Sequence, residues 1–133
     1  MALRKPAVLA LVVWTFLVWT VRLGNVWRDS EMSTAGKIGR TAVILVLTAL
    51  LVAVMAHMFR GALTAGRRAV RLLALATMFI WVQRLLTIVV FGAHDASFKT
   101  VHAIIGVVSI VLAYLALRSV ADREPEPEDI APV

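Results

Sequence analysis

Four long apolar stretches divide the chain. They cover residues 6–21, 41–59, 72–90 and 100–117, and the only charged side chain inside them is Arg84 in the third. A helix of about 20 residues crosses a hydrocarbon core of ~30 Å, and in lipid each backbone polar group must be satisfied within its own segment. The pattern therefore predicts an all-α polytopic membrane protein, an antiparallel four-transmembrane-helix bundle with short loops.

The predicted boundaries follow the polar residues between these stretches. Helices are expected at about 6–26, 41–59, 71–91 and 99–118, within a transmembrane domain over 1–121. The connections 24–39, 60–68 and 91–99 are short, which makes successive helices antiparallel neighbours. Gly36 and Gly39 are interpreted as part of the first loop. Among the tryptophans, Trp19 and Trp27 fit an interfacial belt, whereas Trp14 and Trp81 fit packing positions.

Charge is distributed unevenly along the chain. The 133 residues are 61% hydrophobic, with a formal net charge of +6 and no cysteine. Residues 1–121 hold 13 basic and 3 acidic side chains, whereas residues 122–133 hold one basic and five acidic ones. An acidic, proline-containing segment cannot bury a core, so the tail over 122–133 is expected to be disordered or bound to a partner. The basic residues lie at membrane boundaries and do not indicate nucleic-acid binding.

Lysine and arginine at the helix ends predict the orientation. Eight of them lie on the side of the two termini, and five lie on the other side, which places both termini in the cytoplasm by the positive-inside rule. Four arginines gather in the second connection, where they are expected to contact anionic lipid headgroups: Arg60, Arg67, Arg68 and Arg71.

Arg84 is the most informative polar residue because a charge inside a membrane helix usually faces a bundle interior or water. Thr77 and Trp81 precede it on the same helix face, so an inward polar face is expected. Snorkelling of Arg84 to the headgroups is the alternative. The ends of the third and fourth helices gather six polar residues that form either a ligand site or an interhelical hydrogen-bond cluster: Gln83, Arg84, Thr87, His94, Asp95 and His102.

Small residues predict where helices approach closely. In the fourth helix, four of them follow His102 at helical spacing: Gly106, Ser109, Ala113 and Ala116. In the second helix, Ala49, Ala53 and Ala56 form a similar stripe. We therefore expect both stripes to be packing faces.

The sequence offers little for catalysis or for cofactors. It has no Ser–His–Asp arrangement or metal-ligand cluster at one membrane depth, so no enzymatic activity and no metal site are expected. No cofactor is expected either, with haem or a quinone as minor alternatives. A haem held by two histidines needs two imidazoles at one depth on facing helices, and only His94 and His102 share a level.

The segment from Phe98 to Val120, FKTVHAIIGVVSIVLAYLALRSV, resembles the last helix of small four-span membrane proteins of high-GC Gram-positive bacteria. The start at Arg4 and Lys5, followed by a tryptophan-rich first helix, is similar to theirs as well. The resemblance implies a multi-pass protein of the bacterial plasma membrane and no catalytic residues.

Three functions are compatible with these features. The leading hypothesis is a non-enzymatic accessory or assembly subunit of a larger membrane complex, such as a transporter or a respiratory complex, with the acidic tail contacting a partner subunit. The alternative is a module that binds a lipid, quinone or haem near the outer ends of the third and fourth helices. A small transporter is the third hypothesis. It ranks last because proton-coupled transporters usually carry an acidic residue within a membrane span, and none of the four predicted spans contains Asp or Glu.

Overall fold

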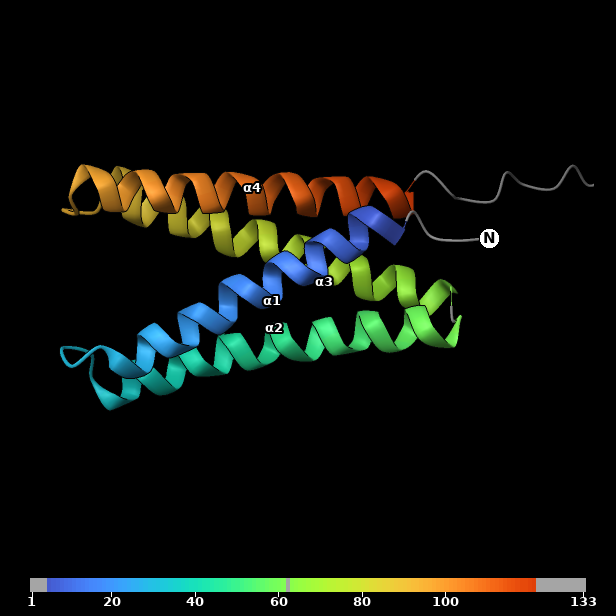
Figure 1. The fold of residues 1–133 in the computed structure, drawn as a ribbon, viewed down its shortest axis with the longest axis horizontal. Helices are drawn as coiled ribbons and strands as arrows, with labels where there is room; N and C mark the ends of the chain where they lie inside the picture. Colours follow the sequence, from blue (N-terminus) through green and yellow to red (C-terminus); the bar gives the residue numbers. More distant parts are fainter. Residues whose placement is uncertain (1–4, 62, 122–133) are drawn as a thin grey trace, which may run out of the picture.

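A computed structural model describes residues 5–61 and 63–121, which form four long helices (Figure 1). The helices are α1 (Lys5–Arg28), α2 (Thr34–Arg60), α3 (Leu63–Leu85), continued by a π-helical turn η1 (Leu86–Val90), and α4 (Ala96–Ala121). Each is long and apolar enough to cross a membrane. The predicted all-α bundle of four antiparallel spans is confirmed. The expected disordered tail, 122–133, lies outside the described residues.

The four helices form a closed ring of neighbours. Each helix packs against the next along the chain, and α1 packs against α4. We call the end with the α1–α2 and α3–α4 loops the two-loop end, and the opposite end the termini end. In Figure 1, α1 runs from α4 at the termini end to α2 at the two-loop end. The pair α1 and α2 therefore diverges from the pair α3 and α4 toward the two-loop end.

Leucine and valine side chains fill the core between the helices, including the fully buried Leu11, Leu47 and Leu73. The interior also holds one polar link between helices, because the indole Nε1 of Trp14 donates to Ser109 Oγ at 2.8 Å. Large apolar side chains cover the outer surface, with Phe59 85% exposed. A bundle that is apolar on both its inner and outer faces is suited to lipid, where its outer residues need no protein partner.

The small-residue face of α4 lies in the interior. Gly106, Ser109, Ala113 and Ala116 are all buried. A Cβ at Gly106 would lie 2.9 Å from Leu85 Cδ2 and 3.0 Å from Trp81 Cε3, so a side chain at this position would require Leu85 or Trp81 to shift. Small residues promote helix packing in membranes because they permit close approach.

The alanine stripe of α2 is not its packing face. Ala49 is exposed, and Ala53 and Ala56 are only partly buried. At 100° per residue the buried face of α2 lies on nearly the opposite side of the helix, and it consists of Ile44, Leu47, Leu51 and Val54. Packing in α2 therefore depends on interdigitating branched side chains rather than on close backbone approach.

Two helices begin well before their predicted starts, and α4 begins three residues early, at Ala96. α2 starts at Thr34 because the Ser33 hydroxyl accepts a hydrogen bond from the Gly36 N–H at 3.2 Å, an N-cap that starts the helix seven residues before position 41. Gly36 and Gly39 are thus helical, and the prediction that they lie in a loop is wrong. α3 also begins eight residues early, at Leu63, and α2 is closed by Gly61, whose φ is 66°.

Trp19 lies in the interior rather than in an interfacial belt. Its side chain is 6% exposed, and its ring centroid lies 6.5 Å from that of Trp81, on α3. The two indoles meet across the bundle between α1 and α3, and such an aromatic contact adds to the stabilisation from burying the rings. The Trp19–Trp81 pair lies between the core and the two-loop end, where the polar residues gather.

Candidate functional site

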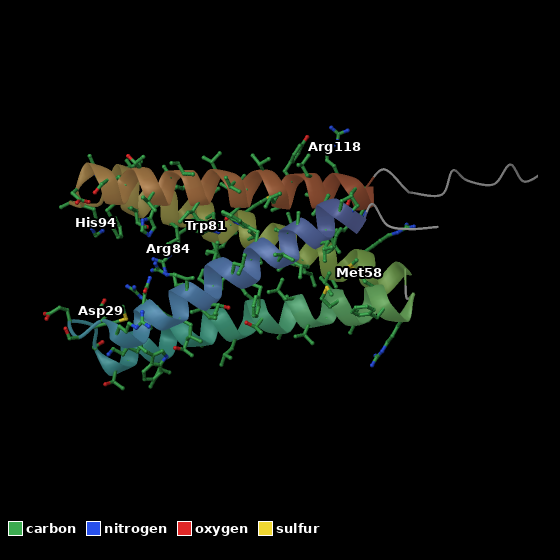
Figure 2. The ribbon with its side chains drawn as sticks, in the orientation of Figure 1. Asp29, Met58, Trp81, Arg84, His94 and Arg118 are labelled. Carbon is green, nitrogen blue, oxygen red and sulfur yellow. The ribbon has the colours of Figure 1, made fainter. Side chains whose placement is uncertain are left out.

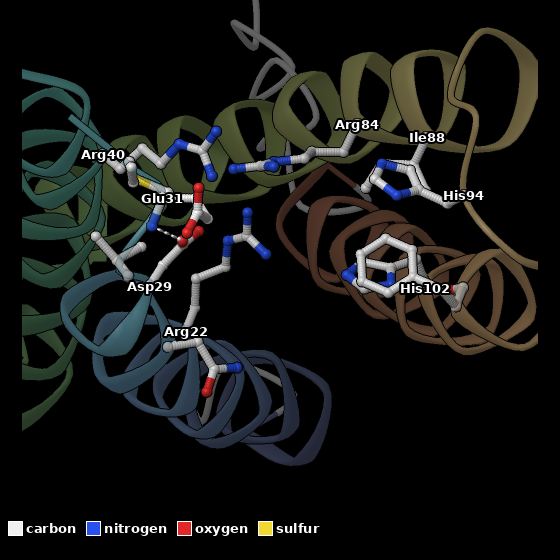
Figure 3. A pocket seen from close by; sticks show the side chains of 12 residues that line it. Arg22, Asp29, Glu31, Arg40, Arg84, Ile88, His94 and His102 are labelled. Carbon is white, nitrogen blue, oxygen red and sulfur yellow. Dashed lines mark hydrogen bonds between the residues drawn. The ribbon is translucent and has the colours of Figure 1, made fainter.

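A cavity of about 500 Å³ opens at the two-loop end, and all four helices contribute to its walls (Figure 3). On one side lie Arg22 of α1 and Arg40 of α2, and on the other lie Arg84 of α3 and His102 of α4. Figure 2 shows Arg84 extending from the α3–α4 pair into the space that separates it from α1 and α2. The divergence of the two helix pairs creates this cavity.

The four residues are level because each is six positions from the end of its helix. Arg22 precedes the end of α1 at Arg28 by six, and Arg40 follows the start of α2 at Thr34 by six. Likewise, Arg84 precedes Val90, the end of η1, and His102 follows Ala96, the start of α4. Six residues of helix correspond to about 9 Å. In Figure 3 the three guanidinium groups converge on one region.

Two carboxylates of the α1–α2 loop, Asp29 and Glu31, also line the cavity. The Glu31 N–H donates to Asp29 Oδ1 at 3.0 Å, which shapes the loop. Within residues 5–61 and 63–121, neither carboxylate forms an ion pair within 4.0 Å of an arginine of the cavity. Three arginines against two carboxylates leave one formal positive charge, with the histidines counted as neutral.

Arg22 illustrates how poorly these cations are satisfied by the protein. Its Nε is buried and, among the described residues, has no hydrogen-bond partner. The guanidinium groups of Arg40 and Arg84 also have no hydrogen-bond partner in this part of the chain. A buried donor without an acceptor costs ~1–3 kcal/mol, and more if it is charged, which applies to Arg22 Nε; Arg84 is partly buried, and Arg40 is exposed. The cavity therefore presents donors and positive charge without enough protein acceptors.

An aromatic stack forms the α4 wall of the cavity. The Phe98 ring packs against His94, with centroids 4.5 Å apart, and against His102, with centroids 4.0 Å apart. His102 Nδ1 lies 2.9 Å from the Phe98 carbonyl oxygen, which can only accept, so Nδ1 carries the proton and Nε2 is free of this bond. This stack differs from two imidazoles on either side of an iron, the arrangement that a bis-histidine haem requires.

The six residues of the predicted polar cluster have different environments. Arg84, His94 and His102 line the cavity. Gln83 lines an adjoining groove together with Arg84. The Thr87 hydroxyl is directed to its own helix and donates to the carbonyl oxygens of Gln83 and Arg84. These placements bring three of the six together.

Asp95, the sixth member, caps α4. Its Oδ1 accepts from the Phe98 N–H at 2.9 Å, and its Oδ2 accepts from the Ser97 hydroxyl at 3.1 Å. This is the geometry of an N-cap carboxylate, which also interacts favourably with the positive end of the helix dipole. Asp95 therefore orients the start of the helix that carries Phe98 and His102, rather than neutralising an arginine.

The last turn of the third span, η1, is π-helical, where the sequence predicted a regular helix. It directs Ile88 inward, where this residue is 6% exposed and lines the cavity. Single π-helical turns occur often at functional sites, because the extra residue in the turn redirects side chains. Here that turn directly follows Arg84.

Arg22 and Arg40 are the cavity residues that the sequence reasoning assigned only to orientation. Arg22 lies at the end of a long apolar stretch, and Arg40 lies at the start of another, so each fits the ordinary pattern of a boundary arginine. Ser33 was the signal that could have revealed their alignment. Once Ser33 is treated as an N-cap, Arg40 is six residues inside α2 and level with Arg22.

The described residues contain no group of three or more His, Cys, Asp or Glu side chains that could hold a metal ion. The cavity instead presents guanidinium groups, which bind carboxylate and phosphate through paired hydrogen bonds.

The chain matches no protein-family model, and neither a curated protein nor a solved structure is detectably similar to it.

Proposed function

We propose that this chain is a multi-pass membrane protein that binds a singly charged anionic group in the cavity at the two-loop end. One observation carries the proposal: Arg22, Arg40 and Arg84 come from three helices and line one cavity without an ion pair among the described residues. An anion would supply the missing acceptors and balance the formal charge of +1. Hydrogen bonds to charged groups contribute ~1.5–3 kcal/mol each.

A purely structural role for the arginines is the competing interpretation, in which Asp29 and Glu31 neutralise them. Both carboxylates lie on an exposed loop and are themselves exposed. Neither forms an ion pair with the three cations. If the two carboxylates served to neutralise the arginines, ion pairs with the partly buried Arg22 and Arg84 would be expected, because an unpaired charge inside a membrane helix is costly. The open geometry supports a site that a ligand completes.

The orientation inferred from the sequence belongs to this proposal. Arg60, Arg68 and Arg71 are exposed at the termini end, where contact with anionic headgroups remains a prediction for them and for Arg67. With the termini end in the cytoplasm, the cavity would open at the outer face of a bacterial plasma membrane. The arginines that orient the protein would then lie on the cytoplasmic side, and the arginines that bind the ligand would lie on the outer side.

The accessory-subunit and transporter hypotheses remain predictions. The acidic tail, on which the accessory role depended, lies outside the described residues. An anion-binding membrane protein could also serve within a larger complex, so binding in the cavity does not exclude this role. Recovery of the protein with defined partners from native membranes would support an accessory role, whereas recovery of a free monomer would count against it.

The proposal is tested with the purified full chain in an uncharged detergent. Dimethyl phosphate is a suitable probe because it is a soluble phosphodiester with one negative charge and no apolar chain. At constant ionic strength, we expect it to raise the melting temperature saturably in the wild type. Arg84→Gln should weaken binding by about tenfold or more, because it removes a charge-assisted hydrogen bond.

Arg28→Gln is the matched control. Arg28 is on the same helix as Arg22, is exposed and is not among the residues that line the cavity. It should therefore leave the binding of dimethyl phosphate unchanged while removing the same formal charge from the same end. Equal losses in Arg28→Gln and Arg84→Gln, or no saturable effect in the wild type, would contradict the proposal.

A further inference from the structure

A second hollow continues from the cavity toward the middle of the membrane. It has a volume of about 280 Å³ and lies between α1, α2 and α3. Arg22, Arg40 and Arg84 line both hollows, so the two spaces meet at the guanidinium groups. We call the second one the α2–α3 groove.

The α2–α3 groove is apolar away from the arginines. Trp19 and Ile44 are almost fully buried and form its inner wall. Val43 of α2 and Phe79 of α3 also line it, and they are 44% and 73% exposed. On helices that span a membrane, such exposed apolar residues face lipid. The groove therefore has a buried inner wall and a side open to the hydrocarbon.

The positions of these residues along their helices give the groove a direction. On α2, Val43 is nine positions from the start of the helix, whereas Arg40 is six positions from it. On the third span, Phe79 is eleven positions before the end at Val90, whereas Arg84 is six positions before it. The apolar part is thus deeper than the arginines by roughly 5–8 Å of helix. Charge lies near the membrane boundary, and apolar surface lies below it.

We infer that the ligand is a phospholipid with one net negative charge, whose phosphodiester binds the three arginines while an acyl chain lies in the α2–α3 groove. This inference rests on the proposed function and specifies its ligand. A lipid has its headgroup at the boundary and its chains toward the middle, which is the order of charged and apolar surface found here. One negative charge balances the formal charge of the cavity, and guanidinium forks suit the phosphate oxygens.

Photocrosslinking in nanodiscs tests the inference on the full chain. The discs consist of phosphatidylcholine with a small fraction of phosphatidylglycerol that carries a diazirine on an acyl chain. A matched probe carries the same diazirine on phosphatidylcholine. We expect phosphatidylglycerol to label the peptides around Val43 and Phe79 about tenfold more than the matched probe does. Phe59 and Phe91, which are exposed elsewhere on the surface, should be labelled equally by both probes.

The arginine variants make the result specific. Arg84→Gln should remove the enrichment at Val43 and Phe79, and Arg28→Gln should retain it. Equal labelling by both probes, or enrichment that survives in Arg84→Gln, would overturn the lipid assignment. If dimethyl phosphate still binds in that case, the cavity takes a free anion and the proposed function stands. If dimethyl phosphate also fails to bind, the proposed function fails with it.

Discussion

Trp14 on α1 and Ser109 on α4 are joined by a hydrogen bond of 2.8 Å across 95 positions of the sequence. Ser109 also donates to the Ile105 carbonyl oxygen at 2.7 Å, so its hydroxyl serves as acceptor and donor at once. Ser109 is 1% exposed. This bond closes the ring of helices by fixing α1 against the small-residue face of α4.

Breaking this bond should destabilise the bundle. Interhelical hydrogen bonds in membranes contribute ~0.6 kcal/mol on average and at most ~1.7 kcal/mol. We expect Ser109→Ala and Trp14→Phe to show a coupling energy in this range in a double-mutant cycle, measured by unfolding in SDS mixed micelles. Ser119→Ala is the control because, among the described residues, its hydroxyl bonds only to the Ala116 carbonyl oxygen of its own helix. Strictly additive effects at positions 14 and 109 would argue against the link.

The close approach of α4 to α3 predicts a penalty at Gly106. Alanine there would place its Cβ 2.9 Å from Leu85 Cδ2 and 3.0 Å from Trp81 Cε3, so these side chains must shift, and overpacking of this kind typically costs ~1–3 kcal/mol. Gly39→Ala is the matched control because nothing lies within 4 Å of a Cβ at that helical position. Alanine should be neutral or raise stability by up to about 1 kcal/mol there, through helix propensity. Equal responses at the two glycines would show that α3 and α4 are less closely packed than described.

The capping role of Asp95 predicts a loss of stability that is separate from binding. Asp95→Ala should lower the free energy of unfolding by ~1 kcal/mol, and Asp95→Ser should restore most of it, because serine also caps helices. Neither variant should alter the affinity for dimethyl phosphate, because Asp95 does not line the cavity. If Asp95→Ala changed that affinity as much as Arg84→Gln does, the carboxylate would belong to the charge balance of the site.

The absence of cysteine makes the orientation directly measurable. Ser30, in the α1–α2 loop, and Ala65, near the start of α3, are exposed at opposite ends of the bundle. A membrane-impermeant maleimide should label Ser30→Cys in intact cells, and it should label Ala65→Cys only after the membrane is permeabilised. The opposite pattern would reverse the proposed orientation and place the cavity at the cytoplasmic face.

The apolar stretches predicted the number and order of the helices, because crossing a membrane requires long, uninterrupted apolar segments. They did not predict where α2 and α3 begin. Residues 34–40 and 63–70 are polar enough to resemble loops, yet the Ser33 cap starts α2 at the first of these segments, and α3 covers the second. The lengths of the hydrophobic segments and of the helices therefore differ, and that difference concealed the alignment of Arg40 with Arg22.

Arg84 and His102 were expected in one polar cluster, and both line the cavity. Arg22 was missed because its proximity to Arg84 depends on how α1 is placed in the bundle relative to α3, which hydropathy does not encode. Asp95 was expected in the same cluster although it caps its own helix, because local hydrogen bonds to the backbone compete with interhelical ones.

The most direct test of the central proposal is a magnetic-resonance distance between one bound phosphorus atom and three guanidinium groups. Protein labelled with ¹⁵N-arginine and saturated with dimethyl phosphate would be studied by solid-state ³¹P–¹⁵N dephasing. The signals would be assigned through Arg22→Gln, Arg40→Gln and Arg84→Gln. Charge-assisted N–H···O bonds have N···O distances of ~2.7–2.9 Å, so all three signals should dephase strongly. Dephasing that is confined to Arg60, Arg68 and Arg71 at the termini end, or that is absent altogether, would contradict a shared anion site.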